Sequence, residues 1–321
     1  MTDERFLVTG ALGCIGSWVV RVLVREGIPT SCLDLAGNPH RLRLILDDDE
    51  IASLRMFSGD IADLSTVERA VKEFGATSII HLAALQVPFC KADPALGARV
   101  NVVGTVNVFE AAKRAGLKHV VYASSIAVYG LSEEYPEGKV DDSAALHPLN
   151  LYGVYKQANE GTARIYWQDE GISSIGLRPY VVYGPGRDQG MTSGPTKAML
   201  AAALGRPFQI PFGGRGVYQY TEDIARIFIQ SARAPLNGAE VFNARGPAVH
   251  MREIVAAIEA CKPAARGQIT FEDRQLALPS DVDDSRLRAV LGGVPETPLE
   301  QGVTQTIAIF EQAAAAGRLP G

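Results

Sequence analysis

Hydrophobic positions in the first half of the chain follow two alternating patterns. Short apolar runs, several rich in β-branched residues, predict strands at 6–8, 31–33, 54–57, 78–82 and 119–123. Between them apolar residues recur every three to four positions, which predicts helices at 17–25 and along Val100, Val103, Val106, Phe109 and Ala112. Strands that alternate with crossover helices form parallel sheets covered on both faces, so we expect an α/β fold with a doubly wound parallel sheet.

The character of the chain changes after about residue 176, where Pro and Gly become frequent. This punctuation predicts a smaller C-terminal α/β lobe made of short elements and loops. The helical pattern of 221–232 and the strand-like run 240–242 favour a return to the first lobe. We therefore expect a first domain of residues 1–176 joined by 221–245, and a second lobe of 177–220 with 246–321.

The composition of the 321 residues, 47% hydrophobic and 21% charged, is typical of an ordered globular chain. A net charge of −5 gives no electrostatic basis for binding nucleic acid or an anionic membrane. The four cysteines, Cys14, Cys32, Cys90 and Cys261, lie far apart, so neither a disulfide framework nor a metal site is expected. No apolar run approaches the roughly 18 residues of a membrane span, and residues 1–5 lead into a strand without a signal peptide. We expect a cytoplasmic protein.

A glycine-rich turn joins the first predicted strand to the first predicted helix. It holds Gly10, Gly13 and Gly16 in the spacing G-x-x-G-x-x-G, with Cys14 and Ile15 between the last two. Such glycines let backbone N–H groups approach a pyrophosphate at a helix N-terminus. The second strand ends in Asp34, where a carboxylate accepts hydrogen bonds from an adenosine ribose. Together these features predict a Rossmann-type dinucleotide site.

A second group of residues suggests acid–base chemistry. Tyr152 and Lys156 are four positions apart on a predicted helix, so their side chains share one face. An ammonium near a phenol stabilises the phenolate and lowers its pKa, which favours proton exchange with a substrate hydroxyl. Ser124 and Ser125, after the fifth strand, offer a hydroxyl to the same substrate oxygen. Tyr152 and Lys156 are therefore candidates for acid–base chemistry, whereas His81 is expected to be structural.

These motifs give the chain a clear resemblance to the extended short-chain dehydrogenases/reductases of the NAD-dependent epimerase/dehydratase family. The motifs occur in the family's order from residue 6 to about 245: T-G-x-x-G-x-x-G, Asp34, Gly59-Asp60-Ile61, His81-Leu82-Ala83-Ala84, Asn101-x-x-Gly104-Thr105, Ser124-Ser125-x-x-Val128-Tyr129-Gly130, Tyr152-x-x-x-Lys156 and Arg178-x-x-x-Val182-Tyr183-Gly184-Pro185. The resemblance implies an NAD-dependent enzyme whose first domain binds the cofactor and whose second lobe binds a small-molecule substrate. It also implies a homodimer.

The resemblance assigns roles to single residues. It implies that Ser125, Tyr152 and Lys156 are the catalytic residues: Tyr152 would be the acid–base, Lys156 would lower its pKa, and Ser125, rather than Ser124, would position the substrate oxygen. Asp60 and Ile61 would flank the adenine, and Leu82, Ala83 and Ala84 would line the cofactor. Tyr180 would pack near the nicotinamide, and Lys156 would also hold the nicotinamide ribose. Asn101 is expected at the cofactor site, with an equally weighted alternative in which it only fixes backbone geometry.

Three functions remain open on the sequence. The first is a dehydrogenase that moves hydride between bulk NAD and a secondary alcohol; the second is a nucleotide-sugar epimerase, such as a UDP-hexose 4-epimerase, that retains its NAD. The third is a non-catalytic NAD-binding sensor, which the intact Ser125, Tyr152 and Lys156 set disfavours. Asp34 repels a 2′-phosphate, so we expect NAD rather than NADP. A dehydratase is disfavoured because Ile126 and Ala127 cannot transfer protons.

The second lobe departs from the pattern of nucleotide-sugar enzymes in the family. Val181 stands where these enzymes usually carry an Asn that helps bind the diphosphate. Arg215 survives as a possible anion partner, with an equally weighted alternative in which it is a solvated loop arginine. The polar loop 186–193 instead offers Arg187 for a bidentate grip on a carboxylate, with Gln86 expected to face the same cleft. We therefore expect a small hydroxylated substrate, the size of a sugar or sugar acid, without a nucleotide.

Overall fold

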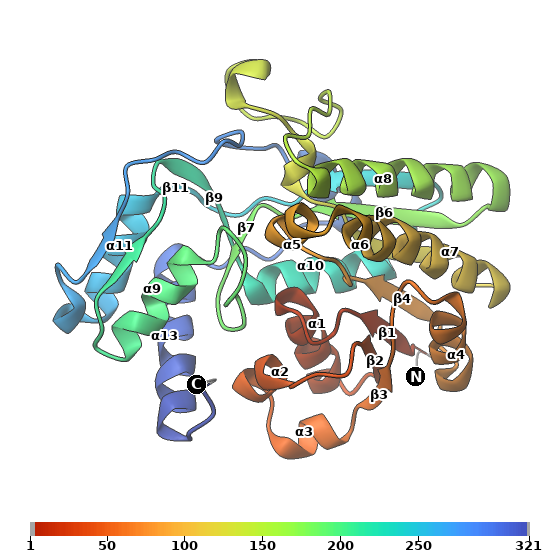
Figure 1. The fold of residues 1–321 in the computed structure, drawn as a ribbon, viewed down its shortest axis with the longest axis horizontal. Coiled ribbons are helices and arrows are strands. Elements are labelled where there is room, and N and C mark those ends of the chain that lie inside the picture. The colour runs from red at the N-terminus through yellow and green to blue at the C-terminus, as the bar shows by residue number, and fades with distance from the viewer. Residues whose placement is uncertain (1–3, 320–321) are drawn as a thin grey trace.

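A seven-stranded, fully parallel sheet forms the centre of the protein (Figure 1). The computed structural model describes residues 4–319; residues 1–3 and 320–321, at the outer ends of the two expected lobes, lie outside the described part. The strands, in the order β10-β6-β5-β4-β1-β2-β3, are β1 (Phe6–Thr9), β2 (Thr30–Asp34), β3 (Arg55–Ser58), β4 (Ser78–His81), β5 (His119–Ala123), β6 (Ser173–Arg178) and β10 (Ala239–Asn243). The predicted doubly wound α/β fold is confirmed.

Helices cover both faces of this sheet. One face carries α1 (Cys14–Arg25) and α10 (Thr221–Arg233), and the other carries α4 (Leu64–Phe74), α7 (Gly104–Arg114) and α8 (Leu151–Glu170). Within β1, Phe6 and Val8 enter one buried cluster while Leu7 enters the other. Because both faces are buried, the strands appear in the sequence as continuous apolar runs.

Short elements occupy the loops at the carboxyl edge and outer rim of this sheet. They are α2 (His40–Ile45), α3 (Asp48–Ala52), α5 (Val87–Ala92), α6 (Pro94–Ala98), the π-helical turn η1 (Arg99–Val103), and the 3₁₀ turns η2 (Ile126–Val128) and η3 (Ser132–Glu134). The predicted helix through Val100 and Ala112 therefore begins as a π-helical turn and continues as α7.

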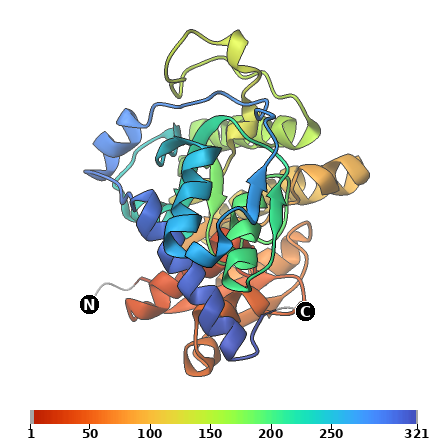
Figure 2. The same ribbon diagram turned by 90° about the vertical axis from the view of Figure 1, so that its left-hand side faces the viewer.

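The second lobe lies on the left in Figure 1 and faces the viewer in Figure 2. It contains a three-stranded sheet, β11-β9-β7, and a two-stranded sheet, β12-β8. Its elements are β7 (Val181–Tyr183), α9 (Gly194–Ala203), β8 (Phe208–Ile210), β9 (Arg215–Tyr220), β11 (Ala248–His250), α11 (Met251–Cys261), η4 (Pro263–Ala265), β12 (Ile269–Phe271), α12 (Ser285–Leu291) and α13 (Leu299–Ala315). The lobe boundary expected at residue 176 falls inside β6, which continues to Arg178. Among the described residues, no helix combines the length and apolarity needed to cross a bilayer.

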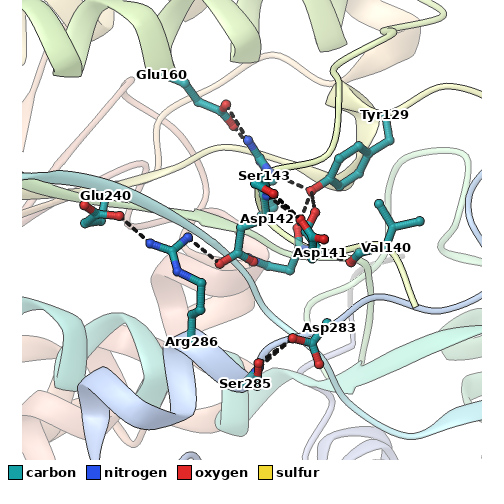
Figure 3. A network of polar contacts seen from close by, with 12 residues as sticks. Tyr129, Val140, Asp141, Asp142, Ser143, Glu160, Glu240, Asp283, Ser285 and Arg286 are labelled. Atoms are coloured by element: carbon teal, nitrogen blue, oxygen red, sulfur yellow. Dashed lines mark hydrogen bonds and ion pairs between the residues drawn. The ribbon is translucent and has the colours of Figure 1, made fainter. Parts of the chain in front are cut away.

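A polar network, buried around Arg178 and exposed at Arg286, ties the sheet to the segment that follows β5. The guanidinium of Arg178 donates to both carboxylate oxygens of Glu160 on α8, at 2.8 and 2.7 Å, and to the Tyr129 hydroxyl at 2.6 Å. Asp142 accepts from Arg286 at 3.0 Å, and Arg286 also bonds Glu240 at 2.7 Å; Figure 3 shows Arg286 between these two carboxylates. The network therefore joins β6, α8, α12 and β10.

His81, at the end of β4, lies buried between two threonines. One ring nitrogen is 2.7 Å from the Thr9 hydroxyl and the other is 3.1 Å from that of Thr105. Burial, with a smaller contribution from the charge of Lys156, lowers the pKa of His81 to about 3. The folded protein therefore holds a neutral ring, which fits the structural role expected for this residue.

Acidification should lower the stability of the folded protein because of the neutral His81 ring. Below the ordinary histidine pKa of 6.5, His81 binds a proton in the unfolded chain but stays neutral in the folded protein. The free energy of unfolding should then fall by about 1.4 kcal/mol per pH unit from this residue, until the folded pKa is reached. We expect urea unfolding between about pH 5 and 7.5 to show a shallower decline for His81→Asn than for the wild type. Equal slopes for the two proteins would contradict the assignment.

Candidate active site

The glycine-rich turn is shaped by close backbone approach. Gly10 has a φ of +67°, and a Cβ at this position would lie 2.5 Å from the backbone nitrogen of Ala83. A Cβ at Gly16 would overlap the carbonyl of Gly10. Gly13 is the N-cap of α1, and no side chain caps this helix end. The turn therefore presents bare backbone N–H groups at a helix N-terminus, which fits a dinucleotide pyrophosphate.

Two cavities meet over this turn at the carboxyl edge of the sheet. The smaller one, about 260 Å³, and the larger one, about 370 Å³, share Gly10, Gly13, Leu82 and Ala84. The smaller cavity is also lined by the predicted residues Asp34, Asp60, Ile61 and Ala83. The larger is lined by the predicted residues Cys14, Ile15, Gly16, Gln86, Ser125, Tyr152, Lys156, Tyr180 and Arg187. A cavity on each side of a phosphate-binding turn matches the two halves of a dinucleotide.

Asp34 lies in the smaller cavity, on the side expected for adenosine. Its carboxylate accepts hydrogen bonds from the backbone N–H groups of Leu12 and Leu35, both at 2.8 Å. Burial raises the pKa of Asp34, while these bonds and the charge of Arg41 oppose that rise. The carboxylate is thus fixed in orientation beside a space that can accept a ribose.

The start of α8 brings Tyr152 beside Ser125. Asn150 caps the helix through a 3.0 Å bond from Gly153 N–H, and a Cβ on Gly153 would overlap the carbonyl of Ala127. Only glycine allows α8 to approach the turn that follows Ser125 so closely, so Gly153 is a site determinant that sequence analysis missed. Tyr152 and Ser125 line the same cavity, and the Ser125 hydroxyl acts to lower the pKa of the Tyr152 phenol.

Lys156 is almost fully buried one turn further along α8. Its ammonium donates to the Ala123 carbonyl at 2.7 Å and lies 5.6 Å from the centre of the Tyr152 ring. Burial lowers the pKa of Lys156 to about 8. An ammonium held at this point can act on a phenol and a ribose hydroxyl at once.

Burial raises the pKa of Tyr152, while the Ser125 hydroxyl and the positive charge of Arg187 oppose the rise. The lowered pKa expected from the Tyr152–Lys156 spacing is therefore wrong for this arrangement, because desolvation of the phenolate outweighs the stabilising groups. Arg187 is a cation near the phenol that the spacing argument did not include.

Two of the predicted site residues lie outside both cavities. Asn101 is buried, and its amide accepts from Leu85 N–H at 2.8 Å and donates to the Leu85 carbonyl at 3.0 Å. Asn101 thus holds the backbone at Leu85, which lines the smaller cavity, without lining a cavity itself. This arrangement fits the alternative in which Asn101 only fixes backbone geometry. Arg215 is exposed on β9, where its backbone pairs with the Gln275 side chain. This position fits the alternative of a solvated loop arginine, and the role of Arg215 as an anion partner stays a prediction.

Other predicted residues are held by contacts that the sequence did not reveal. The Tyr180 hydroxyl donates to the Pro279 carbonyl, which places its ring against the larger cavity. Ser124, which lines the larger cavity, donates to Glu160 at 2.5 Å and so joins the polar network around Arg178.

A strap formed by residues 186–193 crosses from the second lobe to the glycine-rich turn. Asp188 accepts from Arg41 at 2.6 Å and from the His40 ring at 2.8 Å, and Arg41 also donates to the Leu12 carbonyl at 2.9 Å. Just before the strap, the Pro185 carbonyl accepts from the Trp18 indole at 2.8 Å. No local pattern signals these contacts, because Arg41 and Asp188 are 147 positions apart.

Comparisons with known proteins agree with this geometry. The family model of the NAD dependent epimerase/dehydratase family matches residues 6–244. A UDP-glucose 4-epimerase of Mycolicibacterium smegmatis is 32% identical over 316 residues, which are 95% of this chain and 98% of that protein. The UDP-glucose 4-epimerase of Thermus thermophilus, solved in complex with NAD, is 28% identical with a TM-score of 0.82 over 97% of this chain and all of that one. A partial-consensus L-threonine 3-dehydrogenase is 25% identical, with a TM-score of 0.83 over 96% of this chain and all of that one.

Gly10 provides a direct test of the dinucleotide site. We expect Gly10→Ala to weaken NAD binding by about tenfold or more, because the new methyl group displaces the backbone that receives the pyrophosphate. Gly27→Ala is the matched control: Gly27 also has a positive φ, of +71°, but a Cβ there meets nothing within 4 Å. Isothermal titration with NAD should separate the two variants, and wild-type affinity in Gly10→Ala would contradict the site.

Proposed function

The chain belongs to the NAD dependent epimerase/dehydratase family, and we propose that it transfers hydride between NAD and a carbon that bears a secondary hydroxyl group. It is an NAD-dependent enzyme of the extended short-chain dehydrogenase/reductase type. The observation that carries the proposal is the meeting of Ser125, Tyr152 and Lys156 in one cavity that opens onto the glycine-rich turn.

Each residue has a distinct task in this proposal. The glycine-rich turn and Asp34 would hold NAD, which would supply a hydride acceptor beside the substrate carbon. Tyr152, as phenolate, removes the hydroxyl proton, so that the alcohol loses two electrons and two hydrogens and becomes a ketone. The Ser125 hydroxyl hydrogen-bonds the substrate oxygen, and the Lys156 ammonium stabilises the phenolate and binds the ribose. In the reverse direction Tyr152 returns the proton.

We propose a small hydroxylated substrate without a nucleotide. The wall of the larger cavity includes Val181 and the apolar run 276–278, and Arg215 lies outside it. The residues that line this cavity include one lysine, Lys156, and one arginine, Arg187. A diphosphate needs several charged or N–H donors, and the second lobe offers few.

A UDP-sugar 4-epimerase is the second candidate, favoured by the names of the relatives. Such an enzyme would use the same three residues, retain its NAD and return the hydride to the opposite face of the transient ketone. The L-threonine 3-dehydrogenase with a similar fold supports the first candidate instead, because its named substrate carries no nucleotide. The third candidate, a sensor, has no observation in its favour.

The expected homodimer and cytoplasmic location stay predictions. Exposed apolar side chains on α8, Leu151, Val154 and Ile165, together with Val103 on the adjacent η1, offer a face on which a second copy could pack.

Tyr152→Phe removes only the hydroxyl that moves the proton. We expect NADH formation from the preferred alcohol to fall by about 10²–10⁴-fold, while the Kd for NAD changes little. Tyr155→Phe is the control, because Tyr155 is on the same helix but its hydroxyl bonds the Pro94 carbonyl at 2.9 Å. The alcohol used in this assay is first identified by screening polyols and sugar acids for an increase in NADH absorbance. Wild-type turnover by Tyr152→Phe would reject the mechanism.

Titration with UDP distinguishes a small substrate without a nucleotide from a UDP-sugar. The proposal expects no detectable heat when UDP is added to the enzyme–NAD complex. A micromolar Kd, roughly −8 kcal/mol, would instead favour the epimerase. NAD titrated into the same preparation checks that the protein is competent to bind.

A further inference from the structure

The strap carries two adjacent charged residues, one at the larger cavity and one bound to the first lobe. Arg187 lines the larger cavity together with Tyr152 and Ser125. Asp188, the next residue, is held by His40 and Arg41 of α2. One charge thus anchors the strap to the first lobe while the other remains at the cavity.

The Arg187 guanidinium has more donors than partners. One Nη donates to the Thr192 hydroxyl at 2.9 Å, whereas the Nε is buried and has no hydrogen-bond partner in the part of the chain that the structure describes. Within residues 4–319 no carboxylate lies within ion-pair distance of Arg187, although Arg41, Arg178 and Arg245 each have a carboxylate partner. A half-buried guanidinium with unused donors is stabilised by an anion that enters the cavity.

Asp188 does not neutralise Arg187. Hydrogen bonds from Arg41 and His40 lower the pKa of Asp188 despite its burial, so it stays a carboxylate and stays engaged. Its bonds to Arg41 use both carboxylate oxygens. The contacts of Asp188 with Arg41 and His40 therefore hold the strap in place and leave Arg187 without an ion-pair partner from Asp188.

Further polar groups surround the guanidinium. Gly190, with a φ of +92°, folds the strap so closely over Gln86 that a Cβ would overlap the Gln86 amide oxygen, and it would also lie 3.4 Å from an Nη of Arg187. Gln86 and Thr192 line the same cavity. A guanidinium, an amide and a hydroxyl together can bind a carboxylate and a neighbouring hydroxyl group.

We propose that Arg187 binds the carboxylate of the substrate, which makes the substrate class small hydroxy acids with the reacting hydroxyl at Tyr152. This inference rests on the proposed hydride transfer and narrows its substrate. Arg187 and Tyr152 line the same cavity, so one small molecule can place its carboxylate at Arg187 and its reacting hydroxyl at Tyr152. The pyrophosphate of NAD has its own site at the N-terminus of α1, which leaves Arg187 to the substrate.

The experiment compares hydroxy acids with neutral counterparts of the same size. Gluconate is paired with sorbitol, galacturonate with galactose, and glycerate with glycerol, for NADH formation and for binding to the enzyme–NADH complex by NADH fluorescence. We expect the preferred acid to exceed its neutral partner by about tenfold or more in kcat/KM, as removal of a charge-assisted bidentate contact implies. Arg187→Gln should raise the KM for that acid by a similar factor, well beyond any change in the KM for its neutral partner, and leave the Kd for NAD unchanged. Arg187→Lys should recover part of the loss.

Arg215→Gln is the matched control, since this arginine is exposed outside both cavities. Preference for a neutral compound, with an unchanged KM in Arg187→Gln, would overturn the inference while the hydride-transfer function stands. Weaker NAD binding in Arg187→Gln would overturn it in favour of a cofactor phosphate contact. Interconversion of UDP-glucose and UDP-galactose without reaction of any acid or neutral compound would reject the proposed small substrate as well.

Discussion

The ion pair between Arg178 and Glu160 is the contact on which the geometry of the site depends. It joins the end of β6 to the middle of α8, and the two side chains are only 4% and 9% exposed. Glu160 also accepts from Ser124 after β5, and Arg178 also donates to the Tyr129 hydroxyl and the Asp142 carbonyl. Removing one partner of such a pair leaves a buried charge and typically costs about 3–5 kcal/mol. The pair therefore fixes α8 relative to the sheet.

Contacts closer to the chemistry complete this placement. Gly153 lets the start of α8 press against the Ala127 carbonyl, and Lys156 reaches back to the carbonyl of Ala123 at the end of β5. Ser125, Tyr152 and Lys156 are thus mounted on rigid elements that are held by packing and buried hydrogen bonds. Family members that differ in reaction can share this apparatus, because the same proton and hydride movements serve a dehydrogenase and an epimerase.

The wall that faces the substrate is held in a different way. The strap is joined to the first lobe by the partly buried charges of Asp188, Arg41 and His40 and by one bond from Trp18 to Pro185. Partly exposed charge pairs are weaker and more sensitive to salt than buried packing. The catalytic side of the cavity is therefore the more rigid one, and the side that selects the substrate is tied by contacts that can rearrange.

The sequence by itself determined the parallel sheet, the glycine-rich turn, Asp34 and the Tyr152–Lys156 face, because each depends on periodicity or spacing within a short stretch of chain. Only the tertiary structure decided that Asn101 shapes a loop, that Arg215 faces solvent and that burial raises the pKa of Tyr152. It alone revealed the contact of Asp188 with Arg41 and the buried Nε of Arg187, which has no hydrogen-bond partner among the described residues. Burial and charge pairing join segments as far apart as the 147 positions between Arg41 and Asp188, and no local pattern encodes which side chains the fold brings together.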